Sequence, residues 1–427
     1  MWPFSRNNKN TLNTVKVPIV FVPGVMGSRL QLTGLDWDPN STTTMAWSWR
    51  RATRTQKLTA LASRQQEDPG SVVMKLRDDH GFDSVADDFY GGFLKALAKR
   101  KFASATTPVY AVGYDWRRPI QESANLLHAR VIEIMLAEDA KRVIVISHSM
   151  GGLVSRTMFK QYPDLQSKVA GAVHVVQPAV GAVVLYRRFF TGMQDSLDGS
   201  EMADKVFNTI LGRTPADFAA LISVLPGPMQ LCPSGYYQRG KGWLSIERAG
   251  FPPDLPQDQS IFDAYGSASS PPGIYNETLH HSTATKTGLN EVRLKAKAFH
   301  DWIQTYKLEG KTWAIFSTGV NTDVAIWFRN PDDDDPPPDF TADGLTVAPT
   351  QEAEGDGTVP LNSANVLFSG ESYDLTKENT ADPDKHQFQV NGVKHSDAFK
   401  SGEVQEGVYQ LAQQAVNKAV AELKSGN

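Results

Sequence analysis

The sequence predicts an α/β protein whose mostly parallel central sheet is covered by helices on both faces. Two observations predict this class. Apolar runs of strand length alternate with segments whose apolar residues recur at helical intervals, and turns that contain Gly or Pro separate them. The alternation stops after Gly181 and resumes before Thr312. We therefore expect one large core that carries an insertion, which suits a chain of 427 residues.

The first half of the chain supplies the regular alternation. A strand at residues 18–22 ends in a Pro-Gly turn, which is typical of a buried central strand. Helices and strands then alternate, with helices predicted over 92–100, 123–140 and 151–162, and strands predicted over 109–114, 142–146 and 169–176. Because helices connect these strands, the strands are expected to run parallel.

The second half predicts the insertion and the return of the core. Residues 182–301 mix short helical pieces with several Pro and Gly and lack a regular rhythm, so we interpret them as an inserted cap or lid. The core then comprises residues 1–181 and 302–427. The regular alternation returns with a helix predicted over 290–306, which spans this boundary, followed by strands over 312–316 and 363–368 and a final helix over 402–423.

Composition and charge exclude several classes of protein. The net charge of −4 provides no overall basic field, so we expect no nucleic-acid partner. A single cysteine, Cys232, rules out an intramolecular disulfide. The acidic run at 332–335 lacks the alternating oxygen ligands and glycine turn of a calcium loop, so we interpret it as solvated. We expect neither a metal nor a cofactor.

The chain shows no recognisable targeting or membrane-spanning segment. Its first ten residues lack an apolar run, and the apolar run at 17–22 is too short for a secretory signal. No stretch approaches the ~18 apolar residues that a membrane-spanning helix needs. We expect a cytoplasmic protein, with peripheral membrane attachment or export by a signal-independent route as open alternatives.

A serine lies where the strand 142–146 meets the helix 151–162. The sequence there is SHSMGG, residues 147–152, and a strained turn between strand and helix lifts a serine hydroxyl clear of a sheet. Small residues are needed two positions before and two positions after such a serine. Gly151 fits, and Ser147 replaces the usual glycine. The pattern predicts Ser149 as the nucleophile of an α/β-hydrolase fold.

A serine nucleophile needs a base, and the base needs an acid that orients it. In this fold the acid and then the histidine follow the serine along the chain. Asp356 lies between two glycines in GDGTVP, residues 355–360, which suits an acid on a tight turn after a strand. Downstream lie His386 and His395. We favour His395, because it follows a glycine-started loop shortly before the last helix.

Ester chemistry also needs backbone N–H groups that stabilise the oxyanion. The helix after Ser149 supplies the N–H of Met150. The second donor is expected on a loop after an early strand, and residues 23–28, PGVMGS, form that loop. We predict the N–H of Val25 as this donor.

Taken together, these segments resemble the family of lecithin:cholesterol acyltransferase and lysosomal phospholipase A2-like lipases. The resemblance rests on four segments in order, with His395 downstream: VFVPGVMGS at 20–28, YDWR at 114–117, HSMG at 148–151 and GDGTVP at 355–360. It implies Ser149, Asp356 and His395 as the catalytic triad, Val25 and Met150 as oxyanion donors, and a mobile lid. It also implies acyl-ester substrates with water or an alcohol as acceptor.

Two features of the family have no counterpart here. Its animal members use disulfides, which one cysteine cannot form, so their secretory setting does not carry over. Where the family often has a Gly-Thr-Pro segment, this chain has QPAVG at 177–181. For the YDWR segment we consider a buried pair of Asp115 and Arg117 or a purely structural role.

The resemblance further implies a small lobe at a membrane interface, here at about residues 35–74. Trp47 and Trp49 lie in this segment together with several basic residues, a composition that is typical of membrane surfaces. Ordinary packing beside a solvated basic face explains the same residues. Apolar residues of the segment 182–225 are candidates for a lid that contacts substrate or membrane, or for the core of the cap: Tyr186, Phe189 and Phe190.

The leading hypothesis is a lipase or phospholipase that hydrolyses acyl esters of lipids through a Ser-His-Asp triad and an acyl-enzyme. One alternative is an O-acyltransferase that uses the same triad and passes the acyl group to an alcohol. Another is a lipid- or partner-binding protein that kept the fold without catalysis. An exported antibacterial lipase is a weaker alternative. The expected partner is a lipid ester, with peripheral membrane contact open and protein partners unknown.

Overall fold

The computed structural model describes residues 15–38, 42–62, 84–102, 104–193, 215–222, 225–234, 236–237, 243–246, 286–329, 341–342, 345–352, 354–375 and 385–425. The acidic run at 332–335 and the second part of the proposed lobe, residues 63–74, lie outside the described residues.

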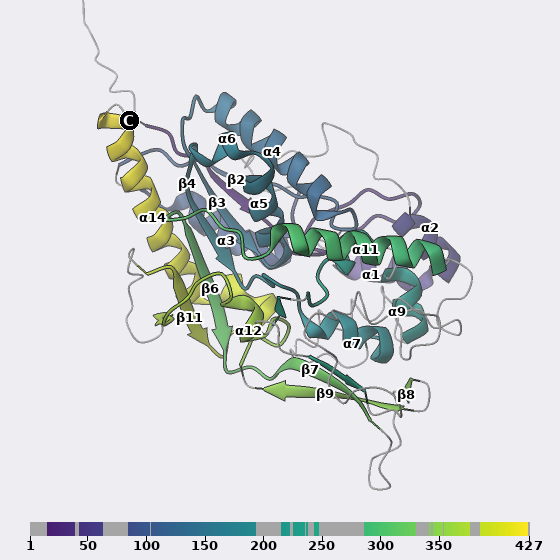
Figure 1. Cartoon of the computed structure of the whole chain (residues 1–427). Coiled ribbons are helices and arrows are strands. Elements are labelled where there is room, and N and C mark those ends of the chain that lie inside the picture. Colours follow the sequence, from purple (N-terminus) through teal and green to yellow (C-terminus); the bar gives the residue numbers. More distant parts are fainter. Residues whose placement is uncertain are drawn as a thin grey trace, which may run out of the picture.

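A seven-stranded parallel sheet forms the centre of the molecule (Figure 1). From one edge to the other its strands are β10 (Tyr373–Asp374), β11 (Gln387–Asn391), β6 (Thr312–Thr318), β4 (Val169–Val175), β3 (Val143–His148), β1 (Ile19–Val22) and β2 (Val109–Ala111). The strand that leads into Ser149, β3, therefore lies inside the sheet, between β1 and β4.

Helices cover both faces of this sheet because its strands are apolar on both sides. In β1, Val20 and Val22 pack in one apolar cluster with α4 (Ile120–Ala137) and α5 (Met150–Gln161), while Ile19 and Phe21 pack in another with α3 (Asp87–Lys99) and α14 (Gly402–Ser425). Alternate residues of a strand point to opposite faces, so continuous apolar runs require a layer on each side. The predicted α/β class and parallel sheet are confirmed.

One predicted strand is a helix. Residues 363–368 were expected to continue the sheet, but α12 (Leu361–Ala364) turns there and a further turn follows. Pro360, with φ −73°, begins the turn, and its carbonyl oxygen accepts the N–H groups of Ser363 and Ala364. The sheet continues instead in the short strands β11 and β10.

A second, four-stranded sheet lies beside the first, with strand order β5 (Leu244–Ile246), β7 (Thr322–Arg329), β9 (Leu345–Glu352) and β8 (Thr341–Ala342). The helix α7 (Val183–Thr191) packs on it (Figure 1). Arg187 of α7 pairs with Asp323 of β7 at 2.6 Å, and both side chains are fully buried. In this sheet β5, which belongs to the proposed cap at residues 182–301, pairs with β7, which belongs to the proposed core. The division into core and cap stays a prediction.

The remaining described helices are α1 (Thr42–Arg51), α2 (Arg54–Ala62), α6 (Pro163–Gln166), α9 (Pro215–Ile222), α10 (Pro226–Met229), α11 (Lys286–Ile303) and the 3-10 helix η3 (His395–Lys400). None of the helices within the described ranges has the length and apolar character needed to cross a bilayer.

Candidate active site

Ser149 lies on the sharp turn between β3 and α5. Its backbone has φ +51° and ψ −124°, a strained conformation for a residue other than glycine. A Cβ at Gly151 would come within 2.4 Å of the Pro23 carbonyl oxygen, so the position requires glycine. The crowding that the sequence pattern implies therefore comes from the loop that follows β1.

Ser147, which replaces the usual glycine of this turn, has a buried partner. Its hydroxyl lies 2.7 Å from Nδ1 of His174 on the neighbouring strand β4. Burial lowers the pKa of His174 to about 3, with a smaller contribution from Arg156. The extra side chain at position 147 is thus accommodated by a hydrogen bond between adjacent strands.

His395 reaches Ser149 from the start of η3, just after β11. Its Nε2 lies 2.9 Å from Ser149 Oγ, and its Nδ1 lies 2.7 Å from Asp356 Oδ2. A carboxylate only accepts hydrogen bonds, so Nδ1 carries the proton and Nε2 accepts the hydrogen of the serine hydroxyl. This tautomer is the one that a general base beside a serine requires.

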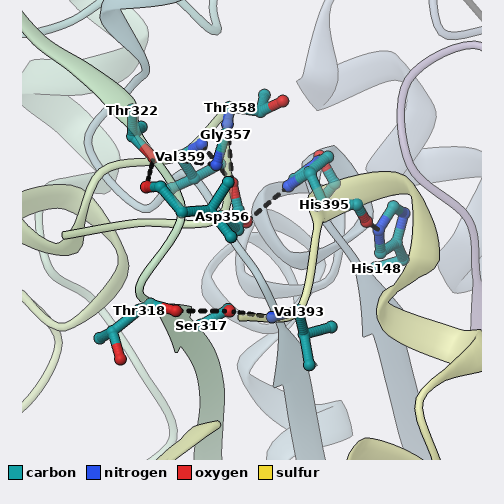
Figure 2. A network of polar contacts seen from close by, with 12 residues as sticks. His148, Ser317, Thr318, Thr322, Asp356, Gly357, Thr358, Val359, Val393 and His395 are labelled. Atoms are coloured by element: carbon teal, nitrogen blue, oxygen red, sulfur yellow. Dashed lines mark hydrogen bonds and ion pairs between the residues drawn. The ribbon is translucent and has the colours of Figure 1, made fainter. Parts of the chain in front are cut away.

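Asp356 lies on a tight turn, and both oxygens of its carboxylate have partners. Oδ1 accepts the backbone N–H groups of Thr358 at 2.9 Å and Val359 at 2.6 Å, while Oδ2 faces His395 (Figure 2). The carbonyl oxygen of Asp356 also accepts the N–H of His395 at 2.9 Å. The side chain and the main chain of Asp356 therefore both hold the catalytic-histidine candidate.

The alternative histidine, His386, lies at the opposite end of the sheet. Its Nδ1 donates to the carbonyl oxygen of Thr312, the first residue of β6, at 3.0 Å, and its ring stacks on Phe368. The structure therefore brings His395, and not His386, to Ser149 and Asp356 at the carboxyl ends of the parallel strands.

Both predicted oxyanion donors lie beside the serine. Met150 is the first residue of α5, so its N–H has no acceptor within the helix. Val25 lies on the turn after β1 and lines the same cavity as Ser149. The Gly24 N–H, by contrast, donates to the hydroxyl of Tyr90 at 3.1 Å. The Gly27 N–H donates to the Gly24 carbonyl oxygen at 3.1 Å, and the place of Val25 beside the cavity is consistent with the predicted role.

A cavity of about 170 Å³ opens at Ser149 and His395. Apolar side chains from six separate segments make most of its wall: Val25, Met26, Phe89, Val184, Leu185, Met193, Phe218, Ile222, Leu231 and Val359. Arg188 of α7 adds a cationic group. The arrangement suits an acyl chain that carries its ester into the cavity.

The predicted contacts of α7 need correction. Tyr186 and Phe189 are fully buried, with their rings packed edge-on against Trp243 and Phe218. The face that lines the cavity is formed by Val184, Leu185 and Arg188 instead, because residues three or four apart share one side of a helix. Phe190 lies on the same helix, and its side chain is outside the described residues.

The two tryptophans of the proposed lobe differ in exposure. Trp47 is 55% exposed, and the guanidinium of Arg51 lies 3.4 Å above its ring. Trp49 is fully buried, donates its indole N–H to the Asp36 carbonyl oxygen at 2.9 Å and packs edge-on against Trp37. The prediction that Trp49 contacts a membrane is therefore wrong, since its indole serves the core of this segment.

The YDWR segment braces the loops around the site. The Tyr114 hydroxyl donates to the Pro23 carbonyl oxygen at 3.0 Å, in the loop at residues 23–28 that carries the predicted donor Val25 (the oxyanion loop). Arg117 is buried and bonds both carboxylate oxygens of Asp115, as considered from the sequence. The same guanidinium donates to the carbonyl oxygens of Ala60 and Leu61 at the end of α2. The segment thus links the helices after the first motif to the sheet.

Sequence reasoning missed two polar groups beside the serine. Tyr90, on α3, lines the cavity and lies 2.9 Å from Nδ1 of His148, which directly precedes the serine. His148 stood inside the recognised motif without an assigned role, and no local pattern marked Tyr90. Within the described ranges, no group of three or more His, Cys, Asp or Glu side chains is placed to hold a metal ion.

The parallel sheet and the strained serine turn at the end of β3 define an α/β-hydrolase fold. Residues 35–226 match the lecithin:cholesterol acyltransferase family, which confirms over this segment the resemblance that the motifs indicate. The matched segment includes Ser149. Asp356 and His395 lie outside it.

Two known proteins extend the comparison. A chain in the crystal structure of the Tle4-Tli4 complex has a TM-score of 0.72 and 17% identity, with 95% of this chain and 99% of that chain covered. This similarity confirms the fold across almost the whole chain. An uncharacterised protein of Saccharomyces cerevisiae, YJR098C, is 34% identical over 86 residues. The match spans 20% of this chain and 13% of the yeast protein.

Proposed function

We propose that this protein is a serine hydrolase that cleaves acyl esters of lipids. The observation that carries the proposal is the pair of hydrogen bonds that joins Ser149 Oγ to His395 Nε2 and His395 Nδ1 to Asp356. A histidine held in this tautomer can take the serine proton as the serine attacks.

The proposed reaction has two halves. Ser149 Oγ attacks the ester carbonyl carbon while its proton moves to His395 Nε2, and the carbonyl oxygen gains negative charge opposite the N–H groups of Val25 and Met150. The bond to the alcohol then breaks, and the protonated His395 returns the proton to the departing oxygen. In the second half, water takes the place of the alcohol and releases a fatty acid and free Ser149.

Two observations support lipid esters as the substrate class. The wall of the cavity beside Ser149 is mostly apolar, which favours a long acyl chain over a polar acyl group. The matched family also takes its description from an acyltransferase that acts on lecithin and cholesterol. The same family description favours an O-acyltransferase as a second candidate, in which an alcohol replaces water in the second half of the reaction.

Product analysis tests both candidates. Purified protein is incubated with a mixed extract of phospholipids and neutral lipids, with and without added sterol or another lipid alcohol, and the products are separated by mass. We expect free fatty acid from the wild-type protein and none above background from Ser149→Ala. Transfer to the alcohol at the expense of fatty acid would assign the second candidate. Absence of both products in every lipid class would contradict the proposal.

We further propose that Trp47 contacts the lipid surface. Its ring is exposed beside Arg51, and an indole next to a cation suits the boundary between headgroups and acyl chains. Replacing Trp47 with serine is expected to weaken binding to vesicles that contain anionic lipid by about tenfold, because a large apolar side chain no longer leaves water.

The matched control is Trp302→Ser, which removes an exposed indole from α11, outside the proposed lobe. Co-sedimentation with vesicles measures both variants, and we expect the control to bind as the wild-type protein does. Equal binding by Trp47→Ser and wild type would exclude this contact without affecting the proposed chemistry.

A further inference from the structure

His148 is a buried histidine that the proposed reaction does not use. It precedes Ser149 directly, and its ring lies between two other groups of the site, with centroids 5.5 Å from Tyr90 and 5.0 Å from His395. Phe399 packs edge-on against the rings of His148 and Tyr90. The ring is thus fixed on several sides, and its two nitrogens face different parts of the site.

The hydrogen bonds of His148 fix its tautomer. Nε2 lies 3.1 Å from the carbonyl oxygen of His395, which can only accept, so Nε2 carries the proton (Figure 2). Nδ1 must then accept, and the hydroxyl of Tyr90, 2.9 Å away, is its donor. Since the hydrogen of this hydroxyl is used in the bond to His148, its oxygen accepts the Gly24 N–H at 3.1 Å.

The resulting chain runs in one direction, from Gly24 N–H to Tyr90, from Tyr90 to His148, and from His148 to the His395 carbonyl oxygen. Each group has the protonation state that this chain needs. Burial lowers the pKa of His148 to about 3, with a smaller contribution from His395, so its ring stays neutral. Burial also raises the pKa of Tyr90 well above its ordinary value, so the hydroxyl keeps its proton.

The two ends of this series of hydrogen bonds are the two parts of the site whose relative positions must be fixed. Gly24 precedes Val25, the predicted oxyanion donor, in the loop after β1. The main chain of His395 carries the predicted base, and its N–H is already held by the Asp356 carbonyl oxygen. The bond from His148 fixes the other side of the same residue. Loop and base lie far apart in sequence, and among the described residues the Tyr90–His148 pair bridges them by hydrogen bonds.

The oxyanion loop is shaped for this contact. A Cβ at Gly24 would lie 2.7 Å from His148 Nδ1, so any larger residue would push the imidazole away from Tyr90. The first glycine of the PGVMGS segment, Gly24, is therefore explained by the close approach of the His148 ring.

We propose that Tyr90 and His148 are positioning residues, which hold the Gly24–Val25 amides and His395 in the mutual arrangement that the transition state requires. The inference rests on the proposed function, because it assigns a role to residues around that site. Neither side chain takes part in bond making. Both act through Val25 and His395, whose contributions arise only when the carbonyl oxygen becomes charged and the serine proton moves.

Tyr90→Phe is the first test. It keeps the ring and removes the hydroxyl, which leaves the Gly24 N–H and His148 Nδ1 without their partner. We expect kcat on a soluble ester to fall about 10- to 100-fold, with KM changed less than about threefold, because ground-state binding does not depend on the oxyanion donors. Each rate is divided by the concentration of active sites, which is measured by labelling with a fluorophosphonate until labelling is complete. A loss of folded protein therefore does not lower the kcat obtained.

The matched control is Tyr237→Phe. This change also removes a buried hydroxyl that donates to a carbonyl oxygen, that of Val324 at 3.0 Å, away from the cavity. We expect a lower melting temperature with kcat per labelled site unchanged. If Tyr90→Phe behaves in the same way, Tyr90 only stabilises the fold and the proposal is overturned.

His148 is tested by comparing two substitutions. Glutamine keeps one acceptor and one donor, whereas leucine keeps neither, so His148→Gln is expected to retain at least about tenfold more kcat than His148→Leu. Combining His148→Gln with Tyr90→Phe should cost less than the product of the single effects, because both changes break one chain. Equal kcat for the two substitutions, or fully multiplicative losses, would overturn the proposal.

The outcome is separable from that of the proposed function. If the wild-type protein hydrolyses the ester but Tyr90→Phe matches it in kcat, the positioning role fails and the hydrolase stands. If the wild-type protein neither hydrolyses an ester nor reacts with the fluorophosphonate, the proposed function fails, and the positioning role fails with it.

Discussion

Ser149→Ala is expected to lower kcat on a lipid ester by about 10⁴- to 10⁶-fold, the loss typical of removing a nucleophile that acts as one unit with its base. The remaining rate should come from the oxyanion donors and substrate binding alone. The change removes one oxygen from a residue with positive φ, so alanine keeps the strained backbone and the fold is expected to survive. Two readouts check the result, namely fatty-acid release and labelling by a fluorophosphonate, which requires the serine oxygen.

The control for labelling is Ser155→Ala, six residues after Ser149 in α5. Its hydroxyl is buried and donates to the Gly151 carbonyl oxygen at 2.7 Å, so it is a serine of the same helix with a structural bond only. We expect Ser155→Ala to be labelled as the wild-type protein is. A folded wild-type protein that resists the probe would contradict both the hydrolase and the acyltransferase, and would favour a binding protein that kept the fold.

Local sequence patterns predicted the inner strands of the central sheet and the position of the serine. The strand predicted at 142–146 had to be covered on both faces, because residues 143–146 are all apolar, and the helix after Ser149 begins where the small residues allow the turn. Asp356 and His395 were identified by their order along the chain and by the turns around them. Those patterns are local, and the structure brings them together at the carboxyl ends of the strands.

Contacts between distant segments could not be predicted from such patterns. Trp49 and Trp47 are two residues apart and look alike in the sequence, yet one is buried against Trp37 and the other is exposed. The aromatic residues of α7 likewise gave no sign of which helix face would meet the cavity. Tyr90 lies on a different helix from every recognised motif, so only the fold reveals its contact with His148.

Asp356→Asn is expected to lower kcat by about 10⁴-fold although it changes a single atom of the site. The reason lies in the backbone around the carboxylate. The N–H groups of Thr358 and Val359 both donate to Oδ1, so the asparagine oxygen is held there and its NH₂ group is turned toward His395 Nδ1. Two donors then face each other, unless the imidazole moves its proton to Nε2 and loses the ability to accept the proton of Ser149.

The opposite orientation of the asparagine amide is also unfavourable, since it would turn the NH₂ group against the two backbone donors. The control is Asp397→Asn, two residues after His395. This change removes an exposed charge that is paired with Lys400. We expect its kcat to stay within about twofold of wild type, because an exposed ion pair contributes little. Steady-state rates per labelled site measure both variants. A loss of less than about tenfold for Asp356→Asn would show that the protein fixes the His395 tautomer without the carboxylate. The hydrogen bonds that Asp356 and His148 make to the main chain of His395 would then be the contacts that orient the base.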